Sequence, residues 1–146
     1  MVIGSSWDSK NYPAEKFVKI ALALKYNCLV VWGSEQEREN ANWMSTQSSN
    51  IQVMPRLDLN SLKALIAKSD LLIGNDTGPT HIAWALNRPS ITIFGPTPIR
   101  MAYQTDINKV VKSASTVNSY KLNRQDFSIK DIDENEIIEL TTTLLH

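Results

Sequence analysis

The sequence predicts an α/β fold, a Rossmann-like parallel sheet with helices on both faces. Three observations predict it. Short runs that are apolar throughout alternate with segments of helical periodicity, and most of the helical segments begin at a cap residue. Strands that alternate with helices form right-handed βαβ units, so the helices cover both faces of the sheet.

The first half of the chain supplies three strands. Val2–Ser5 and Cys28–Trp32 are the first two, and Ile51–Val53 is a short third. A helix opens after the first strand near Pro13, because the first turn of a helix tolerates proline. Its apolar face is formed by Phe17, Ile20, Ala21 and Leu24.

Polar caps open the next two helices. Ser34 begins a helix that extends to about Thr46, and Glu37 completes a capping box. Asp58 caps the following helix. The apolar stripe of that helix is Leu62, Leu65 and Ile66.

The second half continues the alternation. Leu71–Gly74 and Ser90–Phe94 are strands, and the short helix between them opens near Pro79. Val110-Val111 predicts a weak sixth strand, and residues 113–130 show little periodicity and are expected to be loop. A last helix begins after Asp133, with Glu136 in a capping box. The 146 residues are expected to form one domain.

Composition and missing motifs count against several classes of function. Fifteen basic and fifteen acidic residues cancel, so the net charge favours neither nucleic acid nor an anionic membrane. Cys28 is the single cysteine, so no internal disulfide forms, and no Cys/His cluster predicts a metal site. Neither a membrane-spanning stretch nor a signal peptide is present in the sequence, which favours a cytoplasmic location. A Gly-rich dinucleotide fingerprint, a Walker loop and a serine hydrolase elbow are also missing.

Ligands of such a sheet bind at the carboxyl ends of its strands. The strongest candidate site there runs from Asp76 to His81, where a buried strand ends and a helix begins. The helix N-terminus suits a phosphate, Gly78 permits close approach of the backbone, and Thr77 and Thr80 add hydroxyls. The alternative is that Asp76 or Thr77 only caps the helix, with Gly78 relieving a turn and His81 an ordinary helix residue.

Three other segments are expected along the same edge. Ser5, Ser6 and Lys10 offer two hydroxyls and an ammonium to phosphate oxygens, although a lone loop lysine is usually only solvated. Glu35 either accepts both hydroxyls of a ribose or complements a helix dipole. The loop Met54–Leu57 either covers an adenine ring or packs on the domain's own helix.

Several motifs together resemble one family. Gly74-Asn75-Asp76-Thr77-Gly78-Pro79-Thr80-His81, followed by Arg88-Pro89 and Phe94-Gly95-Pro96-Thr97, resembles the heptosyltransferases of lipopolysaccharide core synthesis, glycosyltransferase family 9. Lys10-Asn11-Tyr12-Pro13 and Trp32-Gly33-Ser34-Glu35 are similar to family segments and occur in the same order. The resemblance covers most of the chain and is weakest between Ala102 and Lys130.

The resemblance implies a GT-B fold, in which two Rossmann-like domains face each other across a cleft. The chain, residues 1–146, is similar to the C-terminal domain, which binds ADP-heptose. An N-terminal domain, which binds the Kdo-lipid A acceptor and supplies an acidic general base, is expected outside this sequence, so the chain alone is expected to be inactive. Peripheral contact with the cytoplasmic face of the inner membrane fits such an acceptor.

The resemblance also implies catalytic roles. Lys10 would offset the charge of the leaving group, and Asp76 and His81 would lie beside the heptose and the phosphates. Thr77 and Gly78 would hold phosphate through backbone N–H groups. Neither a metal nor a cofactor is expected, since ADP-heptose is the donor substrate.

Further binding roles follow from the same resemblance. Ser5 and Ser6 would join Lys10 at the diphosphate, Glu35 would bind the ribose, and Leu57 would line the adenine pocket. The transfer of the first heptose, with inversion, is the expected reaction. Two alternatives stay open, which are another GT-B nucleotide-sugar transferase or epimerase and a non-catalytic nucleotide-binding module.

Overall fold

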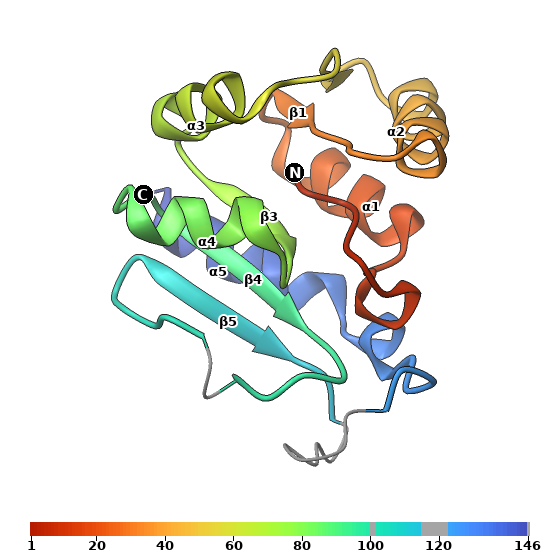
Figure 1. Cartoon of the computed structure of the whole chain (residues 1–146), viewed down its shortest axis with the longest axis vertical. Helices are drawn as coiled ribbons and strands as arrows, with labels where there is room; N and C mark the ends of the chain where they lie inside the picture. The colour runs from red at the N-terminus through yellow and green to blue at the C-terminus, as the bar shows by residue number, and fades with distance from the viewer. Residues whose placement is uncertain (100–101, 115–122, 146) are drawn as a thin grey trace.

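The computed structural model describes residues 1–99, 102–114 and 123–145 and confirms the α/β fold (Figure 1). The strands are β1 (Cys28–Val30), β2 (Ile51–Val53), β3 (Leu72–Asn75), β4 (Ser90–Phe94) and β5 (Asn108–Lys112). The helices are α1 (Ala14–Leu24), α2 (Glu35–Gln47), α3 (Leu59–Lys68), α4 (Gly78–Ala85) and α5 (Glu134–Leu144). Two short 3₁₀ helices are η1 (Asp8–Lys10) and η3 (Ser128–Asp131).

All strand pairs are parallel. β1 pairs with β2, and β3, β4 and β5 form a second group in that order. Val2 joins the two groups, because it forms one parallel bridge to Val31 and another to Gly74. The N-terminal segment therefore lies at the centre, between β1 and β3, which is the strand order of a Rossmann fold.

The predicted first strand is the main difference from expectation. Of Val2–Ser5, only Val2 pairs with its neighbours, and the backbone then leaves the sheet. A Cβ on Gly4 would lie 2.0 Å from the Glu37 carboxyl carbon, so the chain passes directly under the first turn of α2. The predicted loop of residues 113–130 is also partly wrong, since η3 begins at Ser128; residues 115–122 lie outside the described part.

Helices cover both faces of the sheet. α1 packs against α2 and α5, whereas α3 packs against α4. Figure 1 shows α4 in front of the β3–β4–β5 group and α5 behind it. The core between these layers contains fully buried Phe17, Ile20, Val30, Ile91 and Ile93.

The predicted caps at Ser34 and Asp58 are confirmed. Ser34 accepts a hydrogen bond from the Glu37 N–H, and Asp58 accepts one from the Ser61 N–H. At α5, Asp133 caps the helix through the Asn135 N–H. These caps fix where α2, α3 and α5 begin, and α2 consequently starts at the carboxyl edge of β1.

Candidate functional site

The candidate site lies where the strand order reverses, between the N-terminal segment and β3. The loop after the N-terminal segment carries Lys10, and the loop after β3 carries Asp76. The Lys10 ammonium lies 3.6 Å from Asp76 Oδ2, and only 15% and 16% of the two side chains are exposed. Two segments distant in sequence are therefore joined by an ion pair at the crevice where such folds bind ligands.

Three side chains converge on the Asp76 carboxylate. Besides Lys10, His81 Nε2 lies 3.0 Å from Oδ1, and the Thr97 hydroxyl donates to Oδ2 over 3.1 Å. The His81 ring stacks on Trp84 at a centroid distance of 4.4 Å. The structure thus brings Lys10, Asp76 and His81 together and adds Thr97 to them, while the catalytic roles of the three stay predictions.

A buried asparagine joins the loop of Lys10 to the sheet. Asn75 is fully buried, and its Oδ1 accepts the Tyr12 backbone N–H over 3.0 Å. The Asn75 amide donates to Asn11 Oδ1 over 3.4 Å, and Asn11 also accepts a bond from the Ser5 hydroxyl over 2.8 Å. Because a buried amide needs such partners, this network holds the loop in one shape.

Sequence reasoning missed the roles of Asn11, Asn75 and Thr97. Asn75 and Thr97 belong to the motifs that carry the family resemblance, but no spacing rule relates them to their partners. One available signal was a polar side chain at the end of an apolar strand, which needs a partner when it is buried.

The N-terminus of α4 offers a ligand fewer free backbone N–H donors than the N-terminus of an ordinary helix does. Pro79 has no N–H, and the amides of Thr80 and His81 both donate to the Thr77 carbonyl. Of the first four residues of α4, Gly78 is therefore the one whose N–H is neither missing nor used in these two hydrogen bonds. The Thr80 hydroxyl is buried and donates to the Asn75 carbonyl over 2.7 Å, so it is not free to bind a ligand.

The remaining predicted residues lie around this centre. Ser6 is exposed, whereas the Ser5 hydroxyl also bonds the Trp7 carbonyl over 2.8 Å. Glu35 is exposed and forms an ion pair with Arg38 at 3.3 Å. Leu57 is half-buried between β2 and α3. Their roles toward ribose, adenine and phosphate stay predictions.

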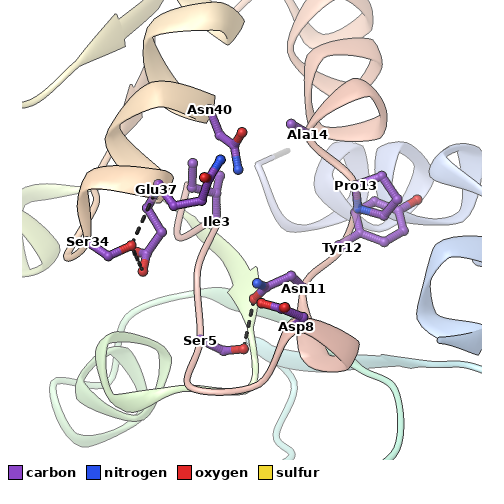
Figure 2. Close-up of a pocket in the computed structure, with 11 residues that line it drawn as sticks. Ile3, Ser5, Asp8, Asn11, Tyr12, Pro13, Ala14, Ser34, Glu37 and Asn40 are labelled. Carbon is purple, nitrogen blue, oxygen red and sulfur yellow. Dashed lines mark hydrogen bonds between the residues drawn. The ribbon is translucent and has the colours of Figure 1, made fainter. Parts of the chain in front are cut away.

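A cavity of about 220 Å³ lies between the Lys10 loop and α2 (Figure 2). Its lining is mostly polar and includes Ser5, Asp8, Asn11, Ser34, Glu37 and Asn40. Figure 2 shows Glu37 directed toward Ser34, and the Ser34 hydroxyl donates to Glu37 over 3.0 Å. The acidic residue of α2 that lines this cavity is therefore Glu37, whereas Glu35 lies outside it.

A second, open hollow of about 540 Å³ follows β1 and β2. Its lining includes Trp32, whose indole N–H donates to the Met54 carbonyl over 2.7 Å. The guanidinium groups of Arg38 and Arg56 lie 5.6 and 4.9 Å from the ring centroid. The loop predicted to cover an adenine ring thus borders a hollow with an aromatic wall.

Tyr12 anchors the loop from the opposite side. Its hydroxyl is buried and donates to the Ile132 carbonyl over 2.7 Å. Burial, and secondarily the negative charge of Glu134, raises the pKa of Tyr12 well above its usual range. The hydroxyl therefore stays protonated and remains a donor at any ordinary pH.

The part of the chain that the structure describes holds neither a cluster of metal-ligating side chains nor a helix that could cross a membrane. Within residues 1–99, 102–114 and 123–145, no three His, Cys, Asp or Glu side chains are grouped as metal ligands. Over the same ranges, every helix is too short or too polar to cross a bilayer.

Known heptosyltransferases are similar to this chain. A model described as glycosyltransferase family 9 (heptosyltransferase) matches residues 1–131. Lipopolysaccharide heptosyltransferase 1 of Campylobacter coli is 37% identical over 153 residues, covering 97% of this chain and 45% of that protein.

Solved structures of heptosyltransferases have a similar fold. The E. coli heptosyltransferase WaaC with ADP matches with a TM-score of 0.82 at 20% identity, covering 98% of this chain and 42% of that one. The same enzyme with ADP-2-deoxy-2-fluoro heptose matches with a TM-score of 0.79 at 20% identity, covering 97% and 41%. The chain thus has the fold of one part of a GT-B heptosyltransferase and spans less than half the length of these relatives. With its family model matched over residues 1–131, the chain belongs to glycosyltransferase family 9, the heptosyltransferases.

Proposed function

We propose that this chain is the donor-binding domain of an inverting heptosyltransferase, which transfers heptose from ADP-heptose to the inner core of lipopolysaccharide. The observation that carries the proposal is the convergence of Lys10, Asp76 and His81 at the reversal of strand order. The ligands named for the similar E. coli structures, ADP and an ADP-heptose analogue, support an adenosine diphosphate sugar as the donor.

The diphosphate would lie between the Lys10 ammonium and the Gly78 amide. Lys10 forms an ion pair with Asp76, so a diphosphate would compete with Asp76 for this cation. His81 lies against Asp76 Oδ1 and Thr97 donates to Oδ2, so the carboxylate is oriented to accept hydrogen bonds from hydroxyls of the sugar. Asp76 thus binds the sugar, and Lys10 binds the diphosphate.

The reaction is a single displacement at the anomeric carbon of the heptose. The acceptor hydroxyl forms the new C–O bond as the bond to the β-phosphate oxygen breaks, and its proton passes to a base. ADP leaves with the electron pair, and Lys10 and the Gly78 amide stabilise the charge that develops on it. We assign the base and the Kdo-lipid A site to a second domain, so this chain alone is expected to be inactive.

Calorimetric titration of the chain with ADP and with UDP tests the proposal. ADP is expected to bind at least about tenfold more tightly than UDP, because one pocket must distinguish the two bases by hydrogen bonds and shape. Equal affinities, or no binding of ADP, would overturn the donor assignment and favour another nucleotide-sugar enzyme.

A further inference from the structure

The Trp7 ring lies close to two cations. Trp7 precedes Lys10 on the same loop, and the Lys10 ammonium is 5.6 Å from the centre of its ring. The guanidinium carbon of Arg124 is 4.3 Å from the same centre. Both distances lie within the roughly 6 Å over which a ring attracts a cation. A second positive charge therefore reaches the Lys10 loop from a distant part of the chain.

Close packing at Gly95 holds the two segments together. A Cβ on Gly95 would lie 2.9 Å from Ile129 Cβ and 3.3 Å from the Ser9 carbonyl oxygen. η1 and η3 consequently pack against each other over the loop that follows β4. The hydroxyls of Ser128 and Ser113 add a hydrogen bond of 2.9 Å. Arg124 thus approaches the site from a segment that is packed and hydrogen-bonded to the sheet.

Arg124 and Lys10 differ in whether a carboxylate pairs with them. Lys10 is paired with Asp76, whereas no carboxylate in the described ranges forms an ion pair with Arg124. A guanidinium that stacks on an aromatic face keeps its N–H groups free along its edge. These donors match two oxygens of a phosphate in a bidentate arrangement.

We propose that Arg124 is a second cationic contact of the donor's diphosphate, held in place by the Trp7 ring beside Lys10. This inference rests on the proposed function. Stacking on Trp7 orients the guanidinium before the ligand binds, so less side-chain freedom is lost on binding. The diphosphate is then held by a point charge from Lys10 and by a planar fork from Arg124.

The test is calorimetric titration of wild-type chain, Arg124→Gln and Lys130→Gln with ADP and with adenosine. Lys130 is an exposed cation of η3, so Lys130→Gln removes the same charge from the same segment. Arg124→Gln is expected to weaken ADP binding by about tenfold or more, as befits a lost hydrogen bond to a charged group. It is expected to leave adenosine binding unchanged, and Lys130→Gln is expected to change neither.

Three other results of these titrations would overturn the Arg124 contact. Equal ADP affinity of Arg124→Gln and wild type would overturn the Arg124 contact and leave the proposed function intact. Equal losses for ADP and adenosine, with a lower melting temperature, would also overturn it, since Arg124 would then only support the Trp7 loop. Failure of the wild type to bind ADP would overturn the inference together with the proposed function.

Discussion

The Thr97 hydroxyl donates a hydrogen bond of 3.1 Å to Asp76 Oδ2, the same oxygen that faces the Lys10 ammonium. Thr97 is only 9% exposed, so this bond lies largely away from water. The loop after β4 therefore fixes the orientation of a carboxylate that belongs to the loop after β3.

Thr97→Val is expected to lower the free energy of unfolding by about 1 kcal/mol and to weaken ADP binding several-fold. The variant keeps the shape of the side chain but leaves Asp76 Oδ2 without this donor. Thermal denaturation and calorimetry measure the two effects. Thr97→Ser should restore both, and unchanged ADP affinity in Thr97→Val would show that the orientation of Asp76 does not matter for the donor.

Lys10→Ala is expected to weaken ADP binding by roughly tenfold to a hundredfold, the range for hydrogen bonds to charged groups. Its effect on the free energy of unfolding should stay at about 1 kcal/mol, because His81 and Thr97 still hold the Asp76 carboxylate when the ion pair with Lys10 is lost. Lys63→Ala, which removes an exposed cation from α3, serves as the control. Unaltered ADP affinity with unaltered melting would contradict the role of Lys10.

Gly74 and Gly78 should respond to alanine in opposite ways. A Cβ on Gly74 would lie 2.6 Å from Val2 Cβ, whereas one on Gly78 meets nothing within 4 Å. Gly74→Ala should therefore destabilise the chain by about 1–3 kcal/mol through overpacking. Gly78→Ala should leave stability nearly unchanged and weaken ADP binding, because the added methyl obstructs approach to the backbone. A stable Gly78→Ala variant with normal ADP affinity would argue against the phosphate cradle.

Thr92→Val is expected to stabilise the chain by about 1 kcal/mol, since it removes a buried hydroxyl without a partner. Thr92 lies fully buried in β4, and its Oγ1 has no hydrogen-bond partner in the part of the chain that the structure describes. Thr80→Val is the matched control, because the buried Thr80 hydroxyl does bond a carbonyl. Denaturant titration should show opposite shifts for the two variants, and a destabilised Thr92→Val would imply an unseen partner.

Glu134→Gln tests a dependence on pH. Glu134 lies 3.8 Å from Lys16 and 3.3 Å from Lys19, joining α5 to α1. A backbone hydrogen bond at the start of α5, followed by Lys19 and Lys16, lowers the pKa of Glu134 in the folded chain. Its contribution to stability is thus present above the unfolded value of about 4.3 and is lost as the pH falls through the folded value. Melting temperatures of wild type and variant should differ at neutral pH and converge in acid; a constant difference would contradict this.

Most of the fold followed from the sequence because its signals are local. Ser34 and Asp58 cap helices by accepting a hydrogen bond from the N–H three positions later, so both partners of each cap lie within one short stretch of sequence. The first strand was overestimated, since only Val2 pairs with its neighbours and the chain then passes the Glu37 carboxylate, which lies against Gly4. Periodicity carries no information on such a contact.

Proximity among candidate residues could be predicted where motifs mark them and was missed where only the fold brings them together. Lys10, Asp76 and His81 belong to recognisable segments, and the structure brings them together. Tyr12 and Asn75 are 63 positions apart and meet only because the N-terminal segment lies beside β3. Arg124 falls in a region without periodicity, so its stacking on Trp7 had no signal in the sequence.

The bridges of Val2 have a mechanical consequence. Among the described residues, Val2 alone pairs with both strand groups, so the sheet has a narrow seam through its centre. Lys10 lies on the segment that follows Val2, and Gly78 lies on the segment that follows β3. A diphosphate that contacts both residues would act as a clasp across the seam, resisting the opening of one strand group away from the other. Amide hydrogen exchange at Val2 and Asn75 should then slow when ADP is bound, more than at β5, which lies at the far margin of the sheet.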